Sequence, residues 1–367
     1  MAGVSVTTAS HALNKTRFVQ PDTAERVFRA ARELGYSVNS VARGLRTGTS
    51  RTIGVIGHSA LDPFFAEVVV GIEHECYNRG YDVYLGFVEY PHGCTYSGSV
   101  KNFEREEEFL RAVLSGRFDA AHPFDAPEKP DIFEKEKALV AKLLSRDVDG
   151  MVIHPAASDP AVEEVLAGIK PKLALFHRTI KGVEADVFVS DDYAGTLSAL
   201  QRLLALGHRR IGMVYGFSWE GHEVRERFRA YRDALAAAGI SPDTSIMANG
   251  AYELDAAAEA TRRLLSRADP PTAILYWSDP MAIAGMDAAR EAGASVPRDL
   301  SIIGFDDLPL ASRVSPRLSS IRQETVGMGE SMARRLIDRI EGKLEDQYGR
   351  IVSPATYVER ESVAARA

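Results

Sequence analysis

The chain has 367 residues, of which 45% are hydrophobic and 26% are charged, and its formal net charge is −7. These fractions are ordinary for a globular protein, and the length suits two large domains with room for a small third. No run approaches the ~18 consecutive apolar residues of a membrane span, and the N-terminus lacks a secretory-signal pattern. Two cysteines cannot form a disulfide framework. We therefore expect a reduced, cytoplasmic protein with no membrane partner.

Charge is unevenly distributed along the chain. Residues 1–51 contain eight Lys or Arg and three acidic residues, a balance of +5, so the remaining residues carry −12. A basic head on an acidic body suggests that the head meets a polyanion. A solvated basic helix face would give the same balance.

Three short helical segments are predicted in the first 50 residues. Ser5 suits the N-cap of a helix that ends near Asn14, and a second helix covers residues 21–34 before a glycine. A third short segment, 39–46, precedes a Thr/Gly/Ser linker at 47–50. Fifty residues bury little surface, so this head is a small unit attached to a larger body.

From residue 52 onward the pattern alternates between strands and helices. Such alternation is typical of parallel sheets with crossover helices, whose ligands bind beyond the carboxyl ends of the strands. Strands are predicted at 52–57, 81–88, 149–153, 172–176, 186–190, 210–215, 244–249, 272–276 and 300–304. Amphipathic helices are predicted between them, among others at 65–79, 194–206, 223–238 and 281–292.

Seven segments carry a family resemblance: AGVSVTTASHALN, NKTRFV, ELGYSVN, VARGLRTGTSRTIGV, DPFF, ALGHRRI and SIIGFDDLPLA. In this order along nearly the whole chain, they resemble the lactose/galactose-repressor family of bacterial transcription regulators. The head is most similar to the purine and ribose repressors. The resemblance implies an α/β fold: a two-lobed periplasmic-binding-protein-like body of two doubly wound parallel sheets, preceded by a truncated, all-α helix-turn-helix head.

The resemblance also implies domain boundaries, with three crossovers between the lobes. The helix-turn-helix head is expected at 1–38, and the hinge helix and linker at 39–50. The N-terminal lobe is expected at 51–190 plus 305–325, with an insertion at 89–132, and the C-terminal lobe at 191–304 plus 326–367.

DNA contacts follow from the same resemblance. The helix from Ser5 to Asn14 matches a recognition helix that enters the major groove. The residues expected to face base edges are Val6, Thr7 and His11, and those expected on phosphates are Ser5, Arg17 and Thr23. The hinge helix, with Asn39, Ala42 and Leu45, would enter the minor groove and insert Leu45 into a base step. The alternative is that Leu45 is a packing residue.

The head departs from the family pattern at its start. The family has a complete helix before the turn, whereas only Ala2 and Gly3 remain of that stretch. Either Met1 lies inside a longer chain, or the protein has lost DNA binding and is a cytoplasmic effector-binding protein. Retention of the expected DNA contacts in register favours the first interpretation.

Polar and aromatic residues follow the predicted strands. His58, His92, His154 and His177 come after first-lobe strands, and Arg178 follows directly. The residues expected to contact an effector are Phe64, His154, Arg178, Arg227, Tyr252, Ser278 and Asp306. Phe65 and Trp277 offer further flat surfaces, and Asp62, Asp191 and Asp279 fit either the site or helix starts.

Three interpretations of the histidines remain open. Metal binding lacks a local ligand motif. Hydrogen bonding to a hydroxylated or acidic effector is favoured by the nearby arginines, and binding to loop backbone is the third. We expect a cation-rich pocket for a sugar or sugar acid, because arginine donates a fork of hydrogen bonds and aspartate accepts them.

The insertion at 89–132 is far longer than the usual ~2–6-residue loop. It contains a predicted helix over 103–114, whose buried face would consist of Phe103, Leu110, Val113 and Leu114. A lid, a partner surface and a tolerated surface loop are all compatible with this pattern.

The predicted function is that of a ligand-responsive DNA-binding repressor. The family works as homodimers on pseudo-palindromic operators, and an effector between the lobes would move the hinge helices. An enzyme is not expected, because the sequence lacks G-x-S-x-G, a Walker loop, H-E-x-x-H and a dinucleotide fingerprint. No cofactor or metal is expected.

Overall fold

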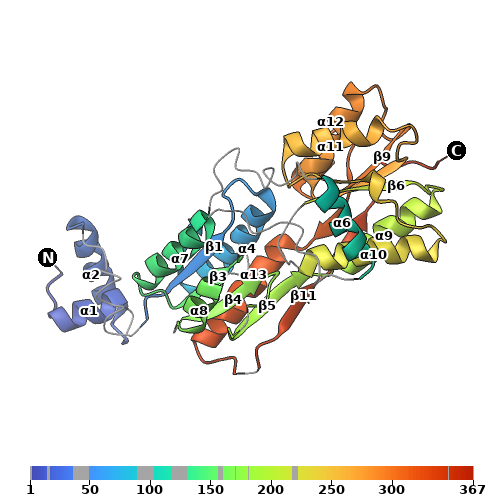
Figure 1. Ribbon diagram of the computed structural model, residues 1–367. Coiled ribbons are helices and arrows are strands. Elements are labelled where there is room, and N and C mark those ends of the chain that lie inside the picture. The colour runs from blue at the N-terminus through green and yellow to red at the C-terminus, as the bar shows by residue number, and fades with distance from the viewer. Residues whose placement is uncertain are drawn as a thin grey trace.

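The computed structural model describes residues 2–14, 17–35, 49–88, 103–116, 130–155, 160–169, 171–180, 182–216, 222–345 and 347–366. Within these ranges the chain forms a helical head and a body of two lobes, each built on a six-stranded sheet. Figure 1 places the head beside the first lobe, at the opposite end of the molecule from the second lobe. The expected fold class is confirmed. None of the helices in these ranges is long and apolar enough to cross a membrane.

The head consists of α1 (Val6–Asn14) and α2 (Pro21–Glu33). Ser5 caps α1 as predicted, because the Thr8 N–H donates to Ser5 Oγ at 3.1 Å. The buried apolar residues of the head, within the described ranges, are Ala12, Val27 and Ala30. The head therefore has only a very small core, as its length predicts. The expected hinge segment at 39–46 lies outside the described residues.

The first lobe is a parallel sheet with the strand order β11-β5-β4-β3-β1-β2. Its strands are β1 (Thr52–Gly57), β2 (Asp82–Phe87), β3 (Gly150–Ile153), β4 (Lys172–Phe176), β5 (Ala185–Ser190) and β11 (Arg350–Ser353). One face packs against α4 (Pro63–Arg79) and α13 (Thr325–Ile340). The other packs against α7 (Pro130–Leu144) and α8 (Pro160–Ala167). Coverage of both faces explains why the inner strands β1, β3, β4 and β5 are mostly buried, whereas the edge strands β2 and β11 are partly exposed.

The second lobe has the strand order β12-β10-β9-β8-β6-β7, and only β12 pairs antiparallel among its described strands. Its strands are β6 (Ile211–Tyr215), β7 (Met247–Asn249), β8 (Ala273–Tyr276), β9 (Ser301–Asp306), β10 (Ser319–Gln323) and β12 (Ala355–Val358). Its helices are α9 (Asp192–Ala205), α10 (His222–Ala237), η1 (Thr244–Ile246), α11 (Leu254–Leu265), α12 (Asp279–Glu291) and η2 (Pro309–Ser312). All of them join one apolar core.

The expected lobe boundaries are wrong near the C-terminus. Residues 305–325 are expected in the first lobe, but β10 pairs with β9 in the second. Residues 326–367 are expected in the second lobe, but α13 packs on α4 and β11 pairs with β5 in the first. Only β12 and the segment after it return to the second lobe. Both sheets use similar short apolar strands, so the sequence pattern does not reveal which sheet a strand joins.

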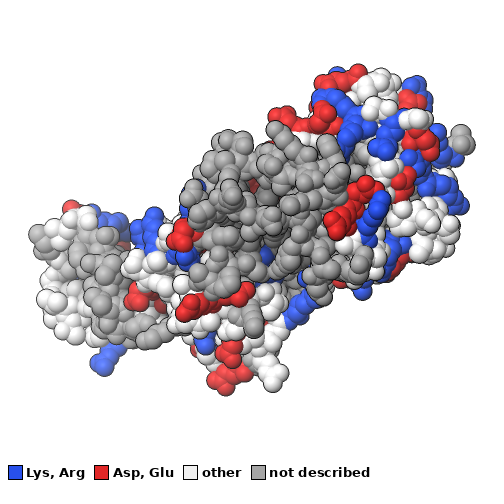
Figure 2. All heavy atoms as spheres, in the orientation of Figure 1, with Lys and Arg blue, Asp and Glu red and all other residues white. Residues whose placement is uncertain are grey.

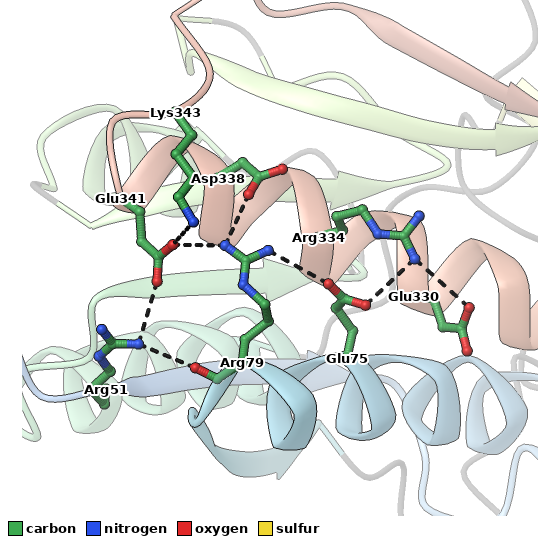
Figure 3. A network of polar contacts seen from close by, with 8 residues as sticks. All are labelled: Arg51, Glu75, Arg79, Glu330, Arg334, Asp338, Glu341 and Lys343. Atoms are coloured by element: carbon green, nitrogen blue, oxygen red, sulfur yellow. Dashed lines mark hydrogen bonds and ion pairs between the residues drawn. The ribbon is translucent and has the colours of Figure 1, made fainter. Parts of the chain in front are cut away.

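Helices α4 and α13 pack against each other on one face of the first-lobe sheet. The helices approach so closely that a Cβ on Gly71 would lie 2.0 Å from Val326 O, and one on Gly329 would lie 2.0 Å from Val68 O. Figure 3 shows the polar network along this crossing, centred on Arg79. Arg79 Nη2 lies 2.9 Å from Asp338 Oδ1 and 2.7 Å from Glu341 Oε2. Glycine at two facing positions thus permits backbone contact that larger side chains would prevent.

The insertion contributes α6 (Phe103–Leu114), which packs on the second lobe. The elements before and after it, β2 and α7, belong to the first lobe, so the chain crosses to the other lobe and returns (Figure 1). Leu110 and Val113 are buried as predicted, and Leu114 is partly buried against the same core. Phe109 is also buried, which the sequence analysis missed. The side chain of Phe103 lies outside the described residues.

Candidate effector site and DNA-binding head

Three histidines follow neighbouring strands of the first lobe. His58 and His154, after β1 and β3, stack with ring centroids 4.0 Å apart and an interplanar angle of 16°. His177, after β4, lies edge-on to His154 at 5.7 Å. Because parallel strands end at one edge of the sheet, residues far apart in sequence meet here. His92 lies outside the described residues.

Burial keeps two of these rings neutral. It lowers the pKa of His58 to about 4 and that of His154 well below the usual value. Neutral imidazoles can donate and accept hydrogen bonds at the same time. Among the described residues, no cluster of His, Cys, Asp or Glu is arranged to hold a metal ion. The histidines are therefore suited to hydrogen bonding.

A close polar contact joins the two lobes at this edge. His177 Nδ1 lies 3.4 Å from Glu223 Oε2, in the first turn of α10, and both side chains are buried. Burial would raise the pKa of Glu223, but His177 and then Arg178 lower it to about 2. Phe64 lies next to this pair, with its ring 6.2 Å from that of His177. The strand ends of the first lobe thus face α10 of the second.

On the second lobe, Arg227 is held from several directions. Its Nε donates to Asp192 Oδ1 at 2.7 Å, and its Nη1 donates to the Trp277 carbonyl at 2.9 Å. Its guanidinium carbon lies 3.5 Å from the ring centroid of Phe305. Asp192 is fully buried and is not among the residues predicted for the site. The sequence shows that an acidic residue follows the Asp191 cap. No local pattern predicts that its side chain contacts an arginine 35 residues later.

Asp306 ends β9 with an unusual backbone, at φ 102°. Gln323 Nε2 donates to its Oδ1 at 2.7 Å. Burial and the Asp279 carboxylate raise the pKa of Asp306 well above the usual value, although Arg227 opposes this. Asp307, His177 and Tyr252 also have positive φ, so left-handed backbone gathers around the strand ends of both lobes. Such conformations cluster at functional sites.

We use "interlobe site" for His154, His177 and Arg178 of the first lobe with Glu223, Arg227 and Asp306 of the second. It also includes the expected Phe64. Within this site Arg227 is paired with Asp192 and burial lowers the pKa of His154. The expected cation-rich character stays a prediction. Tyr252 is 42% exposed on the second lobe.

Several expected site residues form hydrogen bonds within the fold. Ser278 caps α12 by accepting from the Met281 N–H at 3.3 Å. Asp62 and Asp191 cap α4 and α9 by accepting from the N–H groups of Phe64 and Ala194, each at 3.0 Å. Asp279 is buried and accepts from the Leu308 N–H and the Ser320 hydroxyl. The capping alternative was therefore correct for Asp62 and Asp191.

The head presents one face of α1 to solvent. Val6 is 88% exposed, and Thr7 is exposed beside it, so both are accessible to a partner. Arg17 is exposed as well. Thr23 accepts from Arg26 Nη2 at 3.4 Å. Asn39, Ala42 and Leu45 lie outside the described residues.

Comparison with known proteins identifies both parts of the chain. Residues 1–39 match the bacterial regulatory proteins of the lacI family, and residues 200–363 match a periplasmic binding protein-like domain. The HTH-type transcriptional repressor PurR of Photobacterium profundum is 31% identical over 343 residues, covering 94% of this chain and 90% of that protein.

Solved structures of transcription regulators are similar to this chain over nearly its whole length. The transcriptional regulator CelR in complex with cellobiose is 28% identical, with a TM-score of 0.67 over 98% of this chain and 97% of that one. The lac repressor dimer bound to operator and the anti-inducer ONPF has the same fold, with 23% identity and a TM-score of 0.76 over 99% of this chain and 97% of that one. The match at residues 1–39 gives no support to a loss of DNA binding. The chain belongs to the lacI family of bacterial regulatory proteins and is a DNA-binding transcriptional repressor with an effector-binding body, not an enzyme.

Proposed function

We propose that this cytoplasmic repressor is controlled by a neutral sugar bound at the interlobe site. The observation that carries the proposal is a group of buried polar atoms without hydrogen-bond partners among the described residues. They are His154 Nδ1, His177 Nε2 and Arg178 Nη1 of the first lobe, and Asp192 Oδ2 and Trp277 Nε1 of the second. Buried polar groups are normally paired, so a ligand rich in hydroxyls would complete this set.

The charges favour a sugar over a sugar acid. Arg227 is paired with Asp192, and Arg178 lies close enough to Glu223 to lower its pKa. Both arginines of the site therefore already face an acidic side chain. Burial and Asp279 raise the pKa of Asp306, which disfavours a further carboxylate beside it, whereas ligand hydroxyl groups can hydrogen-bond to Asp306 in either protonation state. The relative CelR has been solved with cellobiose, a neutral sugar.

The proposed roles follow the geometry. Phe64 offers its ring to a sugar face, and His154 and Arg178 donate to ring or hydroxyl oxygens. On the second lobe, Arg227 and Tyr252 complete the contacts, and Asp306 accepts from hydroxyls. Ser278, the N-cap of α12, would contact the sugar at the start of that helix. A ligand that touches both lobes would change the His177–Glu223 contact and with it the relation between the lobes.

At the DNA, we propose a homodimer on a pseudo-palindromic operator. Val6, Thr7 and His11 would read base edges in the major groove, and Ser5, Arg17 and Thr23 would contact phosphates. Asn39, Ala42 and Leu45 of the hinge would bind in the minor groove. The exposed face of α1 supports this arrangement.

Titration calorimetry with matched ligand pairs tests the effector class. We expect binding of neutral mono- or disaccharides, such as cellobiose or glucose, and much weaker binding of the corresponding uronic acids. Asp306→Asn should abolish binding, while Asp299→Asn, an exposed site paired with Arg298, should not. Selective binding of uronic acids, or of apolar molecules only, would overturn the proposal.

A further inference from the structure

Phe109 connects the insertion to the aromatic core of the second lobe. It is 7% exposed, and its ring meets Phe228 of α10 edge-on, with centroids 5.9 Å apart at 81°. Tyr215 lies 6.3 Å from Phe109 and 5.5 Å from Phe228, so the three rings form one cluster. This packing is specific to the ring, because edge-on aromatic contacts contribute beyond their buried area. Leu110, the next residue, is buried in the same core but carries no ring, so it cannot make the edge-on contacts of Phe109.

The aromatic contacts continue from Phe109 to the interlobe site. Phe228 packs on Trp277 with ring centroids 4.9 Å apart. Trp277 in turn accepts from Arg227 Nη1 through its carbonyl, and the guanidinium carbon lies 5.4 Å from its ring. Arg227 and Phe228 are consecutive residues of α10, and both contact Trp277. Two ring contacts and one hydrogen bond thus link the insertion to Arg227 of the interlobe site.

We propose that Phe109 is a positioning residue for the interlobe site. Through Phe228 and Trp277, α6 braces the first half of α10 and holds the Arg227 guanidinium against Asp192 and the Trp277 carbonyl. A segment inserted into the first lobe thereby sets the geometry of an effector-site residue in the second. The assignment of Arg227 to effector binding rests on the proposed function, but the bracing itself does not.

Hydrogen exchange and tryptophan fluorescence of the full-length chain test this proposal without an effector. The variants are Phe109→Ala, the milder Phe109→Leu and the matched control Leu110→Ala, all in a Trp219→Phe background so that Trp277 is the remaining tryptophan. We expect Phe109→Ala to raise acrylamide quenching of Trp277 and to speed amide exchange at residues 224–228 about tenfold. Phe109→Leu should show the same change more weakly.

The control separates positioning from general core packing. Leu110→Ala also removes a buried side chain of α6, so a merely structural role predicts the same changes in both alanine variants. Leu110→Ala lowers the stability of the whole second-lobe core, so exchange at 224–228 is compared with exchange at residues 257–264 of the same core. Positioning predicts that Leu110→Ala leaves Trp277 quenching close to that of the parent and leaves the ratio of the two exchange rates unchanged, whereas Phe109→Ala raises both. Equal effects of both alanine variants, or no effect of either Phe109 variant, would overturn the proposal. Cellobiose titration of the same variants then addresses the effector class, so a failure to bind sugar leaves the bracing result standing.

Discussion

Arg227 and Asp192 form a charge pair with almost no solvent contact, at 4% and 0% side-chain exposure. Removing one partner of such a pair leaves the other charge buried without compensation. The pair is thus a structural requirement of the second lobe as well as a part of the interlobe site.

Arg227→Ala is therefore expected to lower the free energy of unfolding by about 3–5 kcal/mol, measured by urea denaturation. Arg202→Ala is the matched control, because Arg202 and its partner Glu359 are 41% and 44% exposed. Its cost should stay below about 1 kcal/mol, since exposed pairs contribute little. Equal costs for the two variants would contradict the uncompensated-charge argument.

Asp279 makes the free energy of unfolding depend on pH, and the direction follows from its raised pKa. Burial raises its pKa to about 7, against the hydrogen bonds from Ser320 and Leu308, which lower it. The folded state therefore binds more protons than the unfolded state between about pH 4 and pH 7, and the stability contributed by this group falls as pH rises through that window.

Asp279→Asn removes this titration. The difference in unfolding free energy between wild type and variant should move in favour of the variant by roughly 2–4 kcal/mol from pH 4 to pH 8. Urea denaturation at both pH values measures it. Asp287→Asn, with a carboxyl 65% exposed, should follow the wild-type pH profile. A constant difference across this range would show that Asp279 is already ionised at low pH.

At the scale of elements, the α4–α13 crossing depends on two glycines. Gly329→Ala would place a methyl group 2.0 Å from the Val68 carbonyl oxygen. Relieving this clash would require the two helix backbones to move apart, which disrupts their packing. We expect a loss of about 3 kcal/mol or more in unfolding free energy.

Gly327→Ala lies in the same helix and meets nothing within 4 Å, so it is the control. It should be neutral or stabilising by up to about 1 kcal/mol through helix propensity. Thermal unfolding of both variants measures the contrast. Comparable behaviour would mean that the helices can separate without cost.

The insertion helix α6 makes a second prediction at this scale. Leu110→Ala should lower the unfolding free energy by about 2–5 kcal/mol, because a buried leucine leaves a cavity. Arg111→Ala, on the exposed face beside Glu107, should change it by less than about 0.5 kcal/mol. If urea denaturation gave equally small effects, α6 would contribute nothing to the second-lobe core.

At the scale of the whole molecule, the distribution of charge differs between the DNA-binding head and the effector-binding body. The head carries the positive balance, whereas acidic and basic residues alternate over the second lobe on the face shown in Figure 2. Many of these are paired, such as Arg262 with Glu291. A polyanion is therefore expected to bind at the head and not at the body.

Binding to a non-specific duplex should weaken steeply with salt, because phosphate contacts release counterions. Arg17→Ala should reduce the slope of log K against log salt by about 1. Arg262→Ala in the second lobe should leave the slope unchanged. Fluorescence anisotropy over a salt series measures all three proteins, and an unchanged slope for Arg17→Ala would remove that residue from the phosphate contacts.

The sequence by itself determined what depends on neighbouring residues. Caps such as Ser5 and Asp62, the alternation of strands and helices, and the family are all legible because each rests on short segments or on their order. Only the tertiary structure decided that residues 305–323 belong to the second lobe, that α6 packs on α10, and that Asp192 neutralises Arg227. These features arise from contacts between segments far apart in the chain, and the free energy of such contacts leaves no local pattern in the sequence.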